Sequence, residues 1–246
     1  MNKILEIKHL DKSFGGVHAI NDLSFDIYEG EILGLIGPNG CGKSTTINLI
    51  TGVYIQDSGE ILFDSQNGQT SLKKQDVPER AKLGLARTFQ SPKPFSRMTV
   101  FDSVYTVCLL YCKSKKEAME KTHELLKLTE FDSLADTLCS KLPIEKRKWL
   151  DMTRALATNP KLLMLDECLA GLTPSEIDNS VELVKRINAT GITILFIEHV
   201  MSAVVNLCHR VVVMNEGHFL SEGDPQVVMR QPEVIKAYLG EDYANA

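Results

Sequence analysis

The chain lacks several features that mark membrane, secreted and nucleic-acid-binding proteins. Its two most apolar stretches fall short of the roughly 18 to 20 residues that span a bilayer, because Asp102 interrupts one and Glu198 and His199 interrupt the other. The first residues have neither the apolar core nor the small-residue cleavage site of a signal peptide, so we expect the chain to stay where it is made. A net charge of −5 removes the basic surplus typical of nucleic-acid binders, and we expect no nucleic-acid partner.

The cysteines show no disulfide or metal-binding pattern. There is no C-x-x-C pair and no nearby histidine ligand, so we interpret the six cysteines as reduced thiols. Cys108 and Cys112 lie four residues apart on an expected helix, but two ligands do not make a zinc site, and core packing is favoured. The chain also has no internal repeat. Its 246 residues suffice for one large α/β domain with an insert.

A glycine-rich stretch with the pattern G-x-x-x-x-G-K-[ST] follows an apolar run, residues 32–36, that is typical of a buried strand. The pattern predicts a loop that wraps the phosphates of a nucleotide, because Gly37 and Gly42 let backbone N–H groups approach oxygens that a Cβ would push away. Lys43 would supply charge for the outer phosphates and Ser44 a hydroxyl for Mg²⁺, at the positive end of a helix. The residues predicted to bind the nucleotide here are Gly37, Pro38, Asn39, Gly40, Cys41, Gly42, Lys43, Ser44 and Thr45.

Two further apolar runs, residues 161–165 and 192–197, are typical of parallel strands covered on both faces. The first carries Asp166 and Glu167 to its carboxyl end, where ligands bind in open α/β sheets. We expect Asp166 to hold Mg²⁺ through water and Glu167 to polarise the water that attacks the γ-phosphate. The second run ends at His199, which could reach the γ-phosphate, although an isolated histidine is more often a hydrogen-bonded surface or core group.

The remaining pattern surrounds this core with antiparallel strands and helices. Alternation of apolar residues predicts antiparallel strands at 4–8 and 23–27, and the adenine end of the nucleotide is expected to lie against them. A helix at 44–50 and a strand at 59–63 come next, and residues 64–76 are interpreted as a polar surface segment.

From residue 91 to about residue 150 the pattern is helical. An N-cap and capping box at Thr173 and Glu176 start a further helix, and residues 211–220 are typical of a hairpin. Two short helical pieces end the chain. We therefore divide a single domain, 1–246, into a nucleotide-binding core with an antiparallel β part (1–90), a helical subdomain (91–150), the rest of the core (151–223) and a C-terminal tail (224–246).

Taken together, these motifs resemble those of the ATP-binding subunits of ABC transporters over nearly the full length. The resemblance implies an α/β fold, with a P-loop NTPase core of mostly parallel sheet, an antiparallel β subdomain and an inserted helical subdomain. It implies ATP and Mg²⁺ as cofactors. The family motifs matched are Walker A at residues 37–44, the Q-loop glutamine at Gln90, Walker B ending in the catalytic Glu167, the D-loop at 170–174, the switch histidine His199 and the adenine-stacking aromatic Phe14. Gln90 would join Ser44 and Asp166 as a Mg²⁺ ligand.

Within that family, residues 84–90, 98–100 and 170–176 are most similar to the ATPases of branched-chain amino acid importers, with urea and amide importer ATPases similar as well. The resemblance implies ATP hydrolysis at the cytoplasmic face of the cell membrane, where the chain is held by membrane permease subunits. Residues 91–100 are the expected permease contact. A solute-binding protein would act indirectly, and a second ATP-binding subunit would complete the motor.

The family's signature motif is degenerate. Its usual Leu-Ser-Gly-Gly-Gln aligns with Leu142-Pro143-Ile144-Glu145-Lys146, and only the leucine remains. In the family this segment contacts ATP on the opposite subunit, and a missing donor at a charged transition state costs ~3 kcal/mol, about a hundredfold in rate. We therefore expect one impaired composite site and a dimer with a nonidentical cassette. The alternative is a regulator that binds ATP without hydrolysing it.

Two features near the signature segment and Walker B have both a structural and a functional interpretation. The charge run Lys146-Arg147-Lys148 is interpreted as a solvated face rather than a phosphate contact. Cys168 stands where the family usually has proline, and a small buried side chain is favoured over a reactive thiol. A family member acting on ribosomes or DNA is disfavoured by the single cassette and the acidic balance.

Overall fold

Two sheets organise the computed structural model, which describes residues 2–65, 68–89 and 92–239. The larger sheet has the strand order β10-β9-β3-β8-β7-β6, and within it β9 and β10 pair antiparallel while the other pairs are parallel. The expected mostly parallel α/β core is therefore confirmed. Its strands are β3 (Ile32–Ile36), β6 (Leu85–Arg87), β7 (Leu162–Asp166), β8 (Thr193–Ile197), β9 (Arg210–Asn215) and β10 (His218–Gly223).

The central strands are largely apolar because both of their faces are covered. Every residue of β3, β7 and β8 is buried. Alternate side chains point to opposite faces, so Leu33 and Leu35 of β3 join one core with the antiparallel sheet, whereas Ile32 and Ile36 join the other with the helices. The continuous apolar runs in the sequence follow from this two-sided cover.

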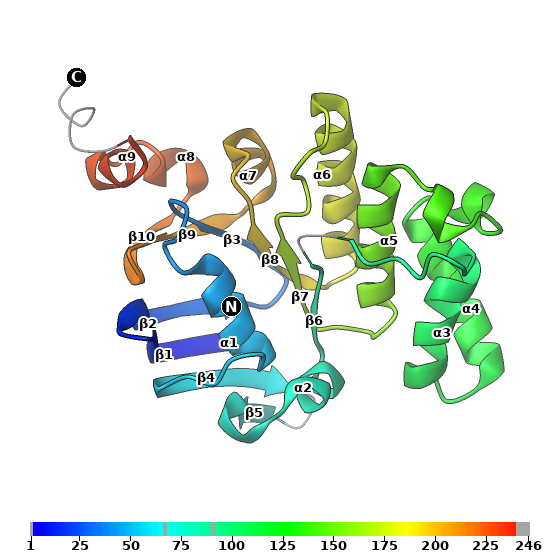
Figure 1. Cartoon of the computed structure of the whole chain (residues 1–246), viewed down its shortest axis with the longest axis horizontal. Coiled ribbons are helices and arrows are strands. Elements are labelled where there is room, and N and C mark those ends of the chain that lie inside the picture. The colour runs from blue at the N-terminus through cyan, green and yellow to red at the C-terminus, as the bar shows by residue number, and fades with distance from the viewer. Residues whose placement is uncertain (1, 66–67, 90–91, 240–246) are drawn as a thin grey trace.

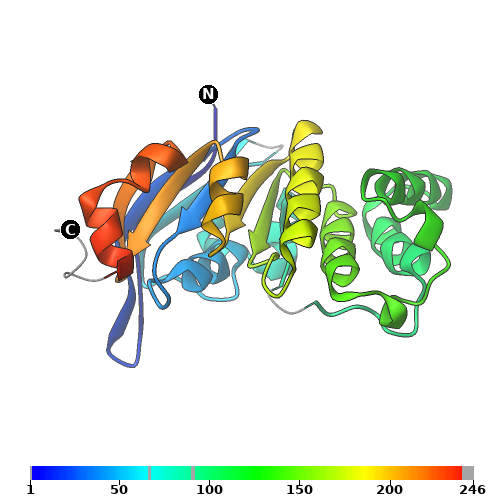
Figure 2. The same cartoon turned by 90° about the horizontal axis from the view of Figure 1, so that it is seen from above.

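The smaller sheet is antiparallel, in the order β2-β1-β4-β5, and Figure 2 shows its β1–β2 hairpin extending from the body of the molecule. Both expected strands are present but longer, as β1 (Lys3–Phe14) and β2 (Val17–Tyr28), and β4 (Ser58–Ser65) contains the third. The interpretation of 64–76 as a polar surface segment is wrong in part. β5 (Gly68–Ser71) pairs with β4 there, and Leu72 is fully buried.

Helices flank the parallel sheet, and α3 and α4 lie at one end of the molecule, as Figure 1 shows. No helix in the described ranges is long and apolar enough to cross a membrane. The expected capping box of α6 is confirmed, whereas α2 and β6 were not predicted. The helices are α1 (Lys43–Thr51), α2 (Val77–Leu83), α3 (Val100–Tyr111), α4 (Lys115–Leu128), α5 (Ile144–Leu156), α6 (Pro174–Ala189), α7 (Met201–Leu207), α8 (Pro225–Val228) and α9 (Pro232–Leu239).

Arg80 of α2 fastens the end of α1 to the segment that follows β5. Its guanidinium is buried and donates to the main-chain oxygens of Leu49 (2.5 Å), Ile50 (2.9 Å), Leu72 (2.6 Å) and Gln75 (2.9 Å). The carbonyls at the end of a helix have no partner within it, and a cation there also meets the negative end of the helix dipole. Arg80 thereby fixes the helix that begins at the phosphate loop.

We expect Arg80→Met to lower the free energy of unfolding by about 3 kcal/mol, because hydrogen bonds from a buried charged group are lost and their acceptors stay buried. Urea unfolding followed by circular dichroism measures the change. The matched control is Arg186→Met, since Arg186 forms an exposed ion pair with Glu130 and should cost under about 1 kcal/mol. Equal losses for the two variants would contradict this account of Arg80.

Candidate functional site

A cleft lies where the parallel strands β3, β7 and β8 reach their carboxyl ends. It has a volume of about 160 Å³. Eight of the predicted site residues line it, namely Asn39, Gly40, Gly42, Lys43, Ser44, Thr45, Glu167 and His199. The structure therefore brings the phosphate loop, the strand-end carboxylate and the histidine to one place, although Glu167 follows the loop by more than 120 residues and His199 by more than 150.

Glycines determine the shape of the phosphate loop. Gly37 has φ +150°, and a Cβ on it would lie 2.1 Å from the main-chain oxygen of Met214. Gly42 has φ 107° and caps α1 without a side-chain hydrogen bond. The N–H groups that begin α1 are therefore not covered by a capping side chain, which is the arrangement that binds anions at helix N-termini.

Lys43 is folded back onto the loop that precedes it. Its Nζ donates to the main-chain oxygens of Gly37 (2.8 Å) and Pro38 (2.9 Å), and the Sγ of Cys41 lies 3.7 Å away. Burial raises the pKa of the Cys41 thiol, so this cysteine is a packed neutral group in the loop. Neutral main-chain oxygens therefore hold the ammonium group near the N-terminus of α1.

Asp166 ends β7 with a carboxylate that is almost fully buried. Burial raises the pKa of this carboxyl, and the Arg87 guanidinium, 3.3 Å from Oδ2, opposes the rise. Its main-chain N–H donates to Oγ1 of Thr88 at 3.3 Å. A hydroxyl at Ser44 and a carboxylate at Asp166 are hard oxygen donors, and Mg²⁺ usually binds proteins through one or two carboxylates together with substrate phosphates. The donor set therefore fits Mg²⁺.

Glu167 and His199 face each other across the ends of β7 and β8. The Nε2 atom of His199 lies 3.2 Å from Oε1 of Glu167. Glu167 has φ +49°, a left-handed conformation that is uncommon outside glycine and that occurs more often at functional sites. Its N–H donates to the main-chain oxygen of Ile197 at 2.9 Å, which attaches the strained residue to the neighbouring strand.

A buried carboxylate that sequence reasoning missed joins the loops after these two strands. Oε1 of Glu198 accepts from the N–H of Leu169 at 2.6 Å, and Oε2 accepts from the N–H of His199 at 3.3 Å. Burial raises the pKa of Glu198 to about 7. Because one side chain holds both loops, it also sets the separation of Glu167 and His199. The sequence showed Glu198 only as a polar residue beside His199.

The charge run at the start of α5 has a structural role. Lys148 is buried, and its Nζ donates to the main-chain oxygens of Glu167 (3.3 Å) and Ala170 (2.7 Å). Arg147 donates to two main-chain oxygens of the segment before the helix. The interpretation of residues 146–148 as a solvated face is therefore wrong for Lys148, which supports the loop that carries Glu167.

The segment aligned with the signature motif begins α5. Pro143 is the N-cap and forms no side-chain cap bond. Ile144 is 44% exposed, whereas Glu145 is only 9% exposed, and no described donor reaches its Oε1 atom. Lys146 lies 3.4 Å from the centre of the Trp149 ring. The branched side chain of Ile144 is therefore exposed at the helix start, whereas the carboxylate of the next residue, Glu145, is buried.

Five of the predicted site residues that the structure describes do not line the cleft, namely Phe14, Gly37, Pro38, Cys41 and Asp166. Gln90 falls outside the described residues. Phe14 is 40% exposed near the tip of the β1–β2 hairpin, where its ring meets Tyr54 edge-on at 5.0 Å. Cys41 is buried behind the loop. Cys168 is buried as well, and burial raises the pKa of its thiol well above the usual range, which fits a small packed side chain.

The C-terminal helix also reaches the phosphate loop. Tyr238 of α9 places a buried hydroxyl beside the backbone of Gly37, and burial raises the pKa of Tyr238 to about 12. The two residues are about two hundred positions apart, so no local pattern could have predicted the contact.

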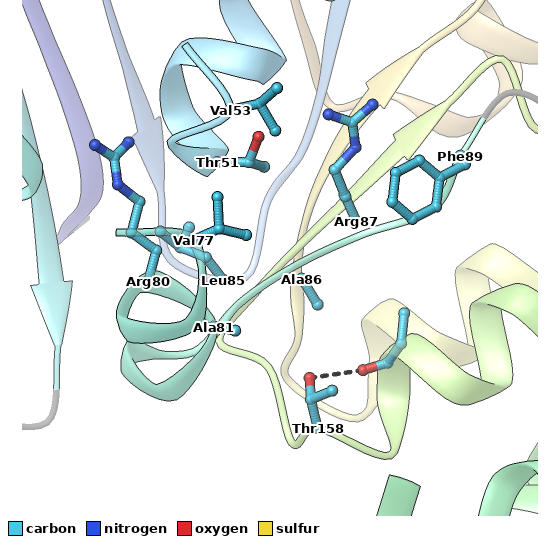
Figure 3. Close-up of a pocket in the computed structure, with 11 residues that line it drawn as sticks. Thr51, Val53, Val77, Arg80, Ala81, Leu85, Ala86, Arg87, Phe89 and Thr158 are labelled. Carbon is cyan, nitrogen blue, oxygen red and sulfur yellow. Dashed lines mark hydrogen bonds between the residues drawn. The ribbon is translucent and has the colours of Figure 1, made fainter. Parts of the chain in front are cut away.

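A separate groove of about 220 Å³ is almost wholly apolar, and Figure 3 shows the side chains that form it. Leu85 contributes from the core, Val53 and Val77 line the groove with exposed side chains, and Phe89 is 53% exposed at one end. Arg87 lines the same groove while its guanidinium reaches Asp166. The groove is therefore linked through Arg87 to the carboxylate that ends β7.

Comparison with known proteins identifies this architecture. A family described as "ABC transporter" matches residues 20–170, which include the phosphate loop and the carboxylates of β7. The chain belongs to the ABC transporter family. A second family, described as "Branched-chain amino acid ATP-binding cassette transporter", matches residues 220–244 at the C-terminal end of the cassette. The family assignment confirms the resemblance found in the sequence.

Curated relatives match along nearly the whole cassette. The branched-chain amino acid transport ATP-binding proteins LivG of Escherichia coli and BraF of Pseudomonas aeruginosa are 34% and 33% identical, and each alignment covers 97% of this chain and 98% of the relative. The lipopolysaccharide export ATP-binding protein LptB of Escherichia coli is 29% identical with the same coverage. By their names, relatives of this cassette therefore work in branched-chain amino acid transport and in lipopolysaccharide export.

Solved structures agree with the fold. A nucleotide-free ATP-binding cassette from an ABC transporter superposes with a TM-score of 0.86 at 31% identity, covering 98% of this chain and 100% of that chain. The ADP conformation of an ATP-binding cassette matches with the same TM-score, identity and coverage. The chain is therefore an ATP-binding cassette in fold as well as in sequence.

The elevated pKa of Glu198 makes stability depend on pH. The folded protein holds a proton on Glu198 between its ordinary pKa of 4.5 and about 7, whereas the unfolded chain releases it. Stability contributed by the protonated carboxyl is therefore present at low pH and falls as pH rises through this window, by up to about 3 kcal/mol. Glu198→Gln should flatten that part of the profile.

Urea unfolding of both proteins at pH 5 and pH 8 measures the effect. In the unchanged cassette, Glu198 should make the free energy of unfolding lower at pH 8 than at pH 5. This contribution should be absent in Glu198→Gln, so its free energy should fall less between the two pH values. Comparing the two proteins removes the contribution of groups that they share. Parallel stability profiles would show that Glu198 titrates normally.

Proposed function

We propose that this cassette is the ATP-hydrolysing subunit of an importer for branched-chain amino acids. The observation that carries the catalytic part is the Glu167–His199 pair, 3.2 Å apart and lining the same cleft as Lys43 and Ser44. The match of residues 220–244 to the branched-chain amino acid cassettes supports the solute class, as do the names of LivG and BraF, whereas LptB is named for lipopolysaccharide export.

The roles proposed for individual residues follow from their positions. The N–H groups of the phosphate loop and Lys43 bind the β- and γ-phosphates, and Ser44 with Asp166 holds Mg²⁺. When bound, Mg²⁺ neutralises charge that develops on the phosphate oxygens. Glu167 orients and polarises the attacking water, and His199, held by its contact with Glu167, completes the constellation at the γ-phosphate.

The degenerate signature supports an asymmetric pair with a nonidentical cassette. Proline at the N-cap removes the usual hydroxyl, Ile144 is exposed where ATP would approach, and Glu145 adds negative charge within the first turn of α5. A helix start normally favours anions, so this substitution weakens the property that the family uses. The chain's own phosphate loop and Glu167 would work with an intact signature from the partner.

The apolar groove beside Phe89 supports a contact with a membrane permease subunit. It exposes Val53, Val77 and Phe89, and apolar patches of this kind mark interaction sites. The chain continues from this groove into residues 92–100, part of the segment expected from the sequence to contact a permease. Such a contact would hold the cassette at the cytoplasmic face of the membrane, with the solute-binding protein acting only through the permease.

Hydrolysis measurements test the asymmetric pair. The purified chain alone should turn ATP over slowly, because each composite site of a homodimer would contain a degenerate signature. Mixing with an ATP-binding cassette that has an intact signature motif should raise turnover, and Glu167→Gln in this chain should then remove at least about 99% of the rate assigned to its site. Brisk homodimer turnover that Glu167→Gln abolishes would defeat the asymmetry, and ATP binding without turnover in either preparation would support a regulatory cassette.

Restoring the signature offers the converse test. Pro143→Ser combined with Glu145→Gly returns the hydroxyl and removes a buried carboxylate whose Oε1 has no described donor. The turnover of the homodimer should rise by roughly ten- to a hundredfold, because an oxyanion-type donor is worth ~3 kcal/mol. Pro143→Ala with Glu145→Ala is the matched control, since it removes the same side chains without supplying the hydroxyl. Equal rates in the two double variants would contradict the role given to the segment.

A further inference from the structure

Arg87 connects three parts of the molecule through one guanidinium. Its Nη1 donates to Oδ1 of Asn48 on α1 at 2.6 Å, and its Nη2 lies 3.3 Å from Oδ2 of Asp166 at the end of β7. Its Nε donates to the main-chain oxygen of Thr88 at 3.3 Å. The helix that begins at the phosphate loop is thus attached to the strand that ends in the buried carboxylate.

The ion pair is largely removed from water. The side chain of Arg87 is 15% exposed and that of Asp166 is 7% exposed. Burying two charges costs several kcal/mol per ion before their attraction is counted, so such a pair is a poor source of stability by itself. The pair is better explained by its positioning of the Asp166 carboxylate than by a contribution to the stability of the fold.

We propose that Arg87 is a positioning residue for the metal carboxylate, holding Asp166 through Oδ2 and aligning it with α1 so that Oδ1 is left for Mg²⁺. This inference rests on the proposed function, because it takes Asp166 as a Mg²⁺ ligand. Partners of a metal ligand set its orientation, and their loss typically lowers metal affinity ten- to a hundredfold. Arg87 is suited to the task because a planar fork can hold Asn48 and Asp166 at the same time.

The groove gives this side chain a second environment. The Arg87 guanidinium lies 5.0 Å from the centre of the Phe89 ring, and both residues line the groove drawn in Figure 3. A segment that fills the groove would therefore contact the same residue that orients Asp166. The Arg87 guanidinium therefore contacts both Asp166 and the groove directly.

The experiment measures Mg²⁺ dependence rather than turnover. Binding of a fluorescent ATP analogue to the full chain is titrated with Mg²⁺, and binding in excess chelator is measured separately. In Arg87→Met the Mg²⁺ concentration at half-maximal binding should rise ten- to a hundredfold, while binding in chelator stays within about twofold. Arg87→Lys keeps the charge but loses the fork, so a severalfold rise is expected, and it decides the matter should Arg87→Met fail to fold.

The matched control is Arg210→Met. Arg210 is a half-buried arginine that pairs with the buried Glu31 at 2.9 Å and lies 5.1 Å from the ring of Tyr28, but it is at the opposite ends of the strands from the cleft. The Arg210→Met variant should have a lower free energy of unfolding and an unchanged Mg²⁺ titration. An Arg87→Met titration that coincides with that of the unchanged chain would overturn the inference, as would an equal shift in Arg210→Met. Absence of Mg²⁺-dependent binding in the unchanged chain would instead overturn the proposed function.

Discussion

The register of the parallel strands β3, β8 and β7 is the constraint on which the site depends. Asp166 pairs with Ile197 in that register, so the residues that follow, Glu167 and Glu198-His199, leave the sheet at the same level. A slip of one residue would turn each side chain to the other face of the sheet and would bury the wrong ones. Apolar cover on both faces holds the register, and chemistry at the strand ends follows from it.

Buried ionisable side chains then position the loops at those ends. Glu198 holds the loops after β7 and β8, Lys148 supports the loop that carries Glu167, and Arg87 holds Asp166. Each of these groups costs free energy to remove from water and is stabilised by specific partners. The left-handed backbone of Glu167 is a further local cost, and the surrounding hydrogen bonds are what maintain it.

Helix α5 contributes to two places through its first two turns. Its Lys148 donates to the main-chain oxygen of Glu167, whereas its N-terminus carries Pro143 and the exposed Ile144 in the segment aligned with the family's signature motif. In the asymmetric pair that we propose, substitutions at the helix start would weaken the partner's site and leave the chain's own constellation intact. The helix start at Pro143 and Ile144 and the support given by Lys148 are therefore separate features of the same helix.

The sequence by itself determined the phosphate loop, the strands that lead to Asp166 and His199, and the capping box of α6, because each depends on residues close together in the chain. It also contained an overlooked capping box that starts α2, whereas β6 has only three residues and shows no usable periodicity. Only the tertiary structure decided that Lys148 is buried and that Arg87 meets Asp166. Residue type does not reveal burial, and contacts between distant segments exist only once the sheet has brought those segments together.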